Sequence, residues 1–244
     1  MKTFRHALQG DAITITAELA LHRQTTVEEA LGQARLLAGF VDGIQIAESP
    51  NAWAQVSPVA LAGLLIRSGI DAIPRLTCRD RNRIALQSDL LGLRATGVTS
   101  VILTRGDDIP DGHELKAKPV YDVSCSELIA MAHAMDEDLL IGTVTTVVSP
   151  TPEQYSRELL VRSGAGARFL QTQPCRDIDV LRRYMQGMVE IKMTWNYSVI
   201  VNLAPLPSAE LMREVAGIPG VSGINLLCMG NPESVIDAIK SSGL

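Results

Sequence analysis

The stretch AIPRLTCRDRNRIALQSDLLGLRATGVTSVILT, residues 72–104, contains a complete strand–helix–strand unit. Short apolar segments stand at its two ends, over Ala72–Thr77 and Ser100–Thr104, and helical periodicity fills the space between them. Gly97 follows the helical segment where a C-terminal stop is expected. Two strands joined by a crossover helix run parallel, so this stretch predicts part of a parallel α/β sheet.

The same alternation continues along the chain. Apolar segments predict six further strands, at Ile13–Leu19, Gly43–Ala47, Leu139–Thr145, Ala167–Thr172, Ser198–Leu203 and Gly223–Cys228. Helix starts lie between them, among them a threonine cap with first-turn carboxylates over 25–29 and the pairs Ser57-Pro58 and Thr151-Pro152. About eight strand–helix units in 244 residues, with no linker rich in Pro, Gly or Ser, predict a single (βα)8 TIM barrel over residues 1–244.

Composition excludes several kinds of partner. The net charge is −5 and no Lys/Arg cluster occurs, which argues against a nucleic-acid surface. No apolar run reaches the roughly 18–20 residues of a membrane span, and the N-terminus lacks the apolar core of a signal peptide. Four cysteines, Cys78, Cys125, Cys175 and Cys228, form no C-x-x-C pair, and the histidines form no metal pattern. We therefore expect a cytoplasmic protein with free thiols and no bound metal. The sequence leaves open whether the chain forms a homo-oligomer or joins a partner subunit.

Functional side chains of such a barrel stand at the C-terminal ends of the strands. Polar residues at or just after those ends are Glu18, Glu48, Thr77, Arg105, Asp107, Gln171, Gln173, Asn202 and Asn225. Glu18 interrupts an apolar segment, where a charged side chain is costly unless it is exposed at the mouth or shares a proton. We interpret it as a candidate general acid, the alternative being a glutamate that simply turns to solvent. Gln173 carries a donor and an acceptor together, which suits a flat heterocycle such as a pterin.

Five segments resemble, in order, the methylenetetrahydrofolate reductase family. They are ITAEL (Ile15–Leu19), RLTCRDRNRIALQSDLLGLRATGVTSVILTRGDDIP (Arg75–Pro110), AKPVYDVS (Ala117–Ser124), GARFLQTQP (Gly166–Pro174) and APLPSAEL (Ala204–Leu211). The segment containing L-T-C-R-D-R-N-R is long and specific, and the five together extend over most of the chain.

This resemblance implies a barrel that binds FAD and tetrahydrofolate at the strand ends and interconverts 5,10-methylene- and 5-methyltetrahydrofolate. By resemblance, Glu18 supplies a proton, Asp107 lies near the flavin and the pterin, and Gln173 binds the pterin, with Thr77 as a further substrate contact. The residues implied at the flavin are Arg105, Gly106, Tyr121, Asp122 and Arg162. The sequence does not identify the electron donor, for which NAD(P)H is a candidate.

Three departures from the family pattern concern the flavin. Residues 142–153 (GTVTTVVSPTPE) lack the aromatic and imidazole groups found there in the family, Leu19-Ala20-Leu21 replaces aromatic and proline residues, and Arg75 replaces a neutral or imidazole side chain. We therefore expect FAD to be held weakly or lost. Two alternatives stay open: a flavin-independent folate enzyme that transfers hydride or a one-carbon unit directly, as in a demethylation, and a folate-binding subunit without activity of its own.

Overall fold

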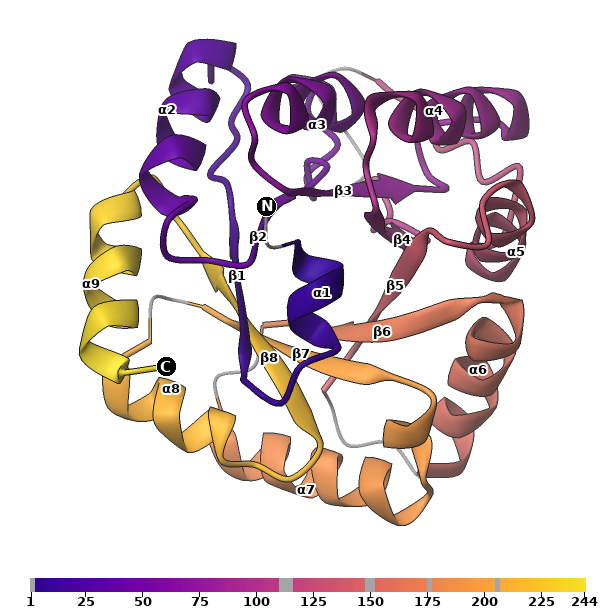
Figure 1. Ribbon diagram of the computed structural model, residues 1–244. Helices are drawn as coiled ribbons and strands as arrows, with labels where there is room; N and C mark the ends of the chain where they lie inside the picture. Colours follow the sequence, from indigo (N-terminus) through magenta and orange to yellow (C-terminus); the bar gives the residue numbers. More distant parts are fainter. Residues whose placement is uncertain (1–2, 110–115, 148–151, 175–176, 205–206) are drawn as a thin grey trace.

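A computed structural model describes residues 3–109, 116–147, 152–174, 177–204 and 207–244. Eight parallel strands pair in chain order and close into one barrel through β8 and β1 (Figure 1). The strands are β1 Thr14–Glu18, β2 Gly43–Ile46, β3 Ala72–Thr77, β4 Ser100–Thr104, β5 Leu140–Thr145, β6 Ala167–Thr172, β7 Ser198–Leu203 and β8 Val221–Leu227. The predicted (βα)8 fold is confirmed. Four strands have the predicted bounds, and β1, β2, β5 and β8 differ by one or two residues at an end.

Helices surround the barrel on its outside (Figure 1). They are α2 Val27–Leu37, α3 Pro58–Arg67, α4 Arg83–Thr96, α5 Cys125–Met135, α6 Pro152–Ala165, α7 Ile178–Glu190, α8 Ala209–Ala216 and α9 Pro232–Ser242, with a short 3-10 helix, η1, at Met193–Trp195. The chain also begins with a helix that the sequence did not predict, α1 at Phe4–Leu8.

Local sequence explains where several helices start and stop. Thr26 accepts a hydrogen bond from the backbone of Glu29, whose side chain bonds back to Thr26, so α2 begins with a reciprocal cap. Gly97 ends α4 in the left-handed conformation, with φ 85°. Ser57 is the cap residue of α3 but makes no side-chain cap bond, and the proline after it fixes the first turn. The predicted cap at Thr151, like Cys175, lies outside the described residues.

Helix α1 closes the N-terminal end of the barrel, and Figure 1 shows it over the centre of the ring of strands. Phe4 is fully buried, and its ring lies 5.1 Å from that of Phe169 in an edge-to-face contact. Room for these rings comes from glycine, because a Cβ on Gly142 would lie 2.1 Å from the Phe169 ring. Asp71 holds the helix start by accepting a 2.7 Å hydrogen bond from the backbone N–H of Phe4. The barrel interior at the N-terminal ends of the strands is therefore filled mainly by an apolar cluster of Phe4, Ile73, Ile102, Phe169 and Ile200.

The part of the barrel interior toward the C-terminal ends of the strands is polar. Successive strand residues alternate in direction, so Phe169 and Gln171 of β6 both point inward, one above the other. Five buried polar side chains occupy this level, namely Thr16, Gln45, Gln171, Asn202 and Asn225. Because polar groups need hydrogen-bond partners inside a protein, this level forms the floor of an open pocket rather than a second apolar layer.

Candidate active site at the C-terminal mouth of the barrel

A pocket of about 350 Å³ opens at the C-terminal ends of the strands. All four residues predicted for catalysis or folate binding line it: Glu18 ends β1, Thr77 ends β3, Asp107 follows β4 and Gln173 follows β6. Glu18 is half-buried, whereas Asp107 and Gln173 are exposed at the rim. The barrel thus brings together side chains that lie up to 155 residues apart in sequence (173 − 18).

Glu18 forms an ion pair inside this pocket. Arg75 Nη2 lies 3.1 Å from Glu18 Oε2, and the two side chains are 20% and 15% exposed. Arg75 occupies an inward position on β3 and also lines the pocket. Its Nε atom is buried and has no hydrogen-bond partner among the described residues. The pocket therefore contains a fixed positive charge beside its most buried candidate catalytic group.

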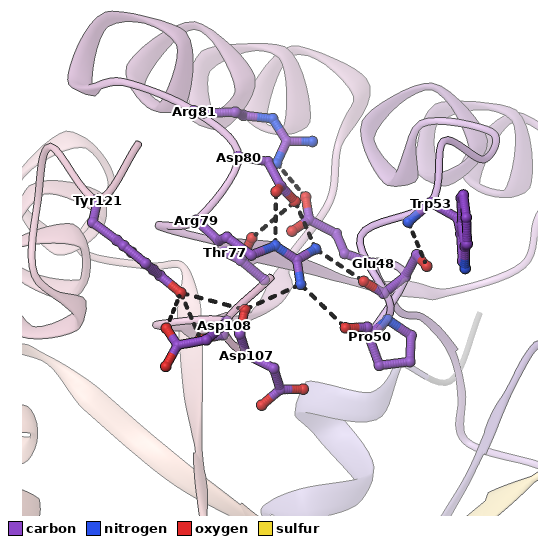
Figure 2. Close-up of polar contacts among 12 residues, drawn as sticks. Glu48, Pro50, Trp53, Thr77, Arg79, Asp80, Arg81, Asp107, Asp108 and Tyr121 are labelled. Atoms are coloured by element: carbon purple, nitrogen blue, oxygen red, sulfur yellow. Dashed lines mark hydrogen bonds and ion pairs between the residues drawn. The ribbon is translucent and has the colours of Figure 1, made fainter. Parts of the chain in front are cut away.

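Arg79 organises the loops around the pocket, a role that the sequence did not reveal. Its side chain is 2% exposed and pairs with Asp80 through Nε, at 2.7 Å. It also donates to the backbone carbonyls of Ser49 at 2.9 Å, Pro50 at 3.2 Å and Asp107 at 3.3 Å (Figure 2). A single guanidinium thereby joins the loops after β2, β3 and β4, because its donors form a rigid planar fork.

Gly106 lets the chain turn toward the pocket after β4. Its φ is 84°, a conformation that side chains rarely adopt, and a Cβ there would lie 3.0 Å from the Cβ atoms of Arg79 and Thr77. The next residue, Asp107, has its backbone carbonyl held by Arg79 and by the Tyr121 hydroxyl, at 3.3 Å each. Figure 2 shows its carboxylate pointing away from both of them. The backbone of Asp107 is fixed while its carboxylate stays available to a ligand.

Glu48 is a second buried carboxyl at the pocket, and it was not among the predicted site residues. It follows β2, is 8% exposed and pairs with Arg81, which also binds Asp89 at 2.7 Å. Burial raises the pKa of Glu48 above its ordinary value, and the positive charge of Arg81 opposes that change. Its place just past a strand end was the signal available in the sequence.

Four of the five residues implied at the flavin line one of two pockets. A second pocket of about 390 Å³ beside α5 is lined by Arg105, Tyr121 and Arg162, whereas Gly106 belongs to the first pocket. The Arg105 guanidinium stacks on the Tyr121 ring at 4.2 Å and pairs with Asp108 at 2.8 Å. Asp108 also accepts a 3.0 Å hydrogen bond from the Tyr121 hydroxyl.

The other two implied flavin contacts have structural partners. Arg162 pairs with Glu158 and donates to the Thr143 hydroxyl at 3.2 Å and the Val144 carbonyl at 2.9 Å. Asp122 accepts a 2.7 Å bond from the backbone N–H of Arg83 at the start of α4, and it lines neither pocket. Arg105, Tyr121 and Arg162 are thus the residues that could meet the phosphates of a cofactor.

No three His, Cys, Asp or Glu side chains in the described ranges come together as a bound metal ion would require. None of the described helices combines the length and apolar character needed to cross a membrane.

The fold and the pocket define a (βα)8 barrel with a ligand site at the C-terminal mouth. The sequence model of the methylenetetrahydrofolate reductase family matches residues 3–229. The chain belongs to the methylenetetrahydrofolate reductase family, as the resemblance of its motifs indicated. No curated protein matches the sequence.

Solved structures share the fold at low sequence identity. A protein of Aquifex aeolicus VF5 superposes with a TM-score of 0.66 at 13% identity, covering 98% of this chain and 95% of that one. A variant tryptophan synthase α-subunit of Pyrococcus furiosus gives 0.65 at 12% identity, with 95% and 98% covered. Thiamine phosphate pyrophosphorylase of the same organism gives 0.54 at 16%, with 95% and 94% covered. Such distant likeness establishes the barrel alone.

Proposed function

We propose that this protein interconverts 5,10-methylenetetrahydrofolate and 5-methyltetrahydrofolate by hydride transfer at the one-carbon group. Membership of the family supports folate-dependent one-carbon oxidoreduction in general. The observation that carries the specific reaction is the convergence of Glu18, Asp107 and Gln173 on one pocket of about 350 Å³. Each of these residues matches a position that the family uses for the folate.

The three side chains suit different parts of that reaction. Reduction requires a proton on N10, which opens the methylene bridge to an N5 iminium, and a hydride on the iminium carbon, which gives the methyl group. Glu18 is the candidate proton donor, since a positioned carboxyl performs this step in many enzymes. The Asp107 carboxylate accepts hydrogen bonds from the N–H groups of the pterin, and the Gln173 amide can both donate and accept. In the oxidative direction the same Glu18 carboxylate receives the proton.

The described residues fit the phosphate end of a flavin cofactor better than its ring. Arg105, Tyr121 and Arg162 offer donors and positive charge to phosphates, beside the N-terminus of α5, which also attracts anions. Both guanidinium groups are engaged, Arg105 by Asp108 and Arg162 by Glu158. For the ring, the end of β5 supplies Thr143, Val144 and Thr145 and no aromatic side chain. A bound flavin would supply hydride, but β5 itself offers no aromatic packing surface to its ring.

A flavin-independent folate enzyme is therefore the second candidate. The pocket volume is near the small end of the roughly 300–1,000 Å³ found for ligand sites, which suits one fused-ring heterocycle better than two stacked ones. In this version, NAD(P)H donates hydride directly or the enzyme transfers a one-carbon unit, as in a demethylation. Both versions use the same folate residues.

One set of measurements separates these functions. The purified chain is characterised by its visible absorption spectrum, its affinity for tetrahydrofolate, and its interconversion of the two folates with NAD(P)H, with and without added FAD. Turnover that requires FAD supports the reductase, and turnover without it supports the second candidate. Binding without any turnover would leave a folate-binding subunit, and failure to bind tetrahydrofolate would refute the proposal.

A further inference from the structure

A chain of hydrogen bonds crosses the polar level of the barrel interior. Gln45 Nε2 donates to Gln171 Oε1 at 2.6 Å and to Thr16 Oγ1 at 3.1 Å. The Thr16 hydroxyl donates to Asn225 Oδ1 at 2.8 Å, and Asn225 Nδ2 donates to Asn202 Oδ1 at 3.1 Å. All five side chains are at most 6% exposed. These hydrogen bonds join residues of β1, β2, β6, β7 and β8.

The direction of these bonds determines what the pocket offers to a ligand. Gln171 and Asn202 stand at the two ends of this series of hydrogen bonds, and both line the pocket. At each end the amide oxygen is already occupied by a donor from inside the barrel. An amide has one oxygen and one NH2 group, so the NH2 groups remain for the ligand. The floor of the pocket therefore presents donors.

Gln171 is the more constrained of the two ends. Its side chain is 1% exposed, and Nε2 has no hydrogen-bond partner among the described residues. A buried donor without a partner costs free energy, so a pocket containing one favours a ligand that places an acceptor there. Arg75 Nε, in the same pocket, is also buried and without a partner in the described chain. These two donors stand beside one ligand cavity, which also contains a buried acceptor without a partner in the described chain, Glu48 Oε2. The two donors suit an acceptor on the inner side of the ligand.

We propose that Gln171 is a substrate-binding residue whose Nε2 donates to a carbonyl oxygen of the bound heterocycle, and that Gln45 is the positioning residue that fixes its amide. The identity of the heterocycle rests on the proposed function. The pterin of a folate carries one ring carbonyl, at position 4, with N–H groups beside it. The carbonyl faces Gln171 on the floor, and the N–H groups suit the Asp107 carboxylate at the rim.

The experiment compares two ligands that differ at position 4 and, as a consequence, in the hydrogen on the adjacent N3. Tetrahydrofolate has the 4-oxo group, and its 4-amino analogue, tetrahydroaminopterin, replaces that acceptor with a donor. Affinities for both are measured by equilibrium dialysis with the wild-type chain and with Gln171→Met, Gln171→Glu and Gln45→Met. Gln186→Met serves as the matched control, because Gln186 is exposed on α7 and does not line the pocket. Circular dichroism confirms that each variant is folded.

The wild-type chain is expected to prefer the 4-oxo ligand. Gln171→Met should weaken tetrahydrofolate binding about tenfold, equivalent to about 1.4 kcal/mol, and remove most of the preference. Gln171→Glu, which presents an acceptor, should reverse the preference, an effect that a purely structural residue would not produce. Gln45→Met should reduce the preference by a smaller factor, since the Gln171 amide stays but is free to rotate. Gln186→Met should match the wild type.

Two negative results have different meanings. If the wild-type chain binds tetrahydrofolate and Gln171→Met keeps both its affinity and its preference, Gln171 is not a substrate-binding residue, although the proposed function stands. If the wild-type chain binds neither ligand, the proposed function fails, and the assignment of Gln171 fails with it. Should Gln171→Glu not fold, the loss of preference in Gln171→Met decides the matter alone.

Discussion

The Arg75 guanidinium lies 3.1 Å from the Glu18 carboxylate, at the mouth of the barrel and mostly shielded from solvent. The resemblance to the family led us to expect a neutral or imidazole side chain at the position of Arg75. The ion pair places opposite charges in direct contact on β1 and β3, strands that are both neighbours of β2. In the proposed reaction, Glu18 would therefore exchange its proton beside a permanent positive charge.

The role of Glu18 can be tested by removing its proton. Replacing Glu18 with Gln should lower turnover about 10²–10⁴-fold, the usual contribution of a positioned proton donor. The dissociation constant of tetrahydrofolate should change far less, because the amide keeps the shape of the side chain. Single-turnover kinetics and equilibrium dialysis separate the two effects. Equal losses of binding and turnover would show that Glu18 is structural.

The ion pair itself predicts a coupling between the two residues. Arg75→Met leaves Glu18 without its partner and should destabilise the fold by about 1–3 kcal/mol, less than for a fully buried pair. The double variant Arg75→Met, Glu18→Gln should be destabilised by about 0.5–3 kcal/mol less than the sum of the two single destabilisations. Urea unfolding of the four proteins gives this coupling energy. Additive effects would mean that the contact contributes nothing to stability.

Gly106 should tolerate no side chain. Gly106→Ala places a Cβ 3.0 Å from the Cβ atoms of Arg79 and Thr77 at φ 84°, which should cost about 1–3 kcal/mol of stability. The resulting shift of Asp107 should also weaken folate binding. Gly32→Ala is the control, because Gly32 lies within α2 with nothing within 4 Å of the new Cβ. That change should stabilise by about 0.4–1 kcal/mol. Similar behaviour of the two variants would contradict the assigned role of Gly106.

The contact between Asp71 and the start of helix α1 predicts a pH dependence of stability. Burial raises the pKa of Asp71 above its ordinary value of 3.8, and bonds from the backbone N–H groups of Phe4 and Ala72 oppose this. A carboxyl with a raised pKa stabilises the fold when protonated, so its contribution is fully present below pH 3.8 and is lost as the pH rises through the folded-state pKa. Asp71→Asn removes this titration while its amide oxygen can still accept from Phe4.

The measurement is the free energy of unfolding of both proteins across the acid range. Relative to the wild type, Asp71→Asn should gain stability as the pH rises above 3.8. Parallel curves for the two proteins would show that Asp71 does not titrate with an altered pKa.

Flavin retention tests the departures at the end of β5. A lost aromatic contact costs about 0.5–1.5 kcal/mol, and a lost charged hydrogen bond about 1.5–3 kcal/mol. Two or three such losses weaken binding by about two to five orders of magnitude. We expect FAD to dissociate during dialysis. The measurement is the visible absorption of the protein that dialysis retains. A yellow protein that keeps stoichiometric FAD through extensive dialysis would contradict this and favour the flavin-dependent reductase.

The sequence by itself determined the barrel and the positions of most candidate site residues. Periodicity and strand length are local properties, so the bounds of β3, β4, β6 and β7 could be predicted to the residue. In a closed parallel barrel the C-terminal ends of all strands meet at one mouth. That geometric rule was enough to place Glu18, Thr77 and Gln173 in one pocket.

Tertiary structure alone decided which of the polar residues pair with one another. Arg79 lies in a run of charged residues that is typical of a solvated loop, yet it is buried because carbonyls from two other loops meet at its guanidinium. Helix α1, at five residues, is too short to show periodicity, and it is held by Phe4 packing inside the barrel. The contacts between Arg75 and Glu18 and between Gln45 and Gln171 span 57 and 126 residues. Such pairs depend on how the strands align around the closed barrel, which no local pattern encodes.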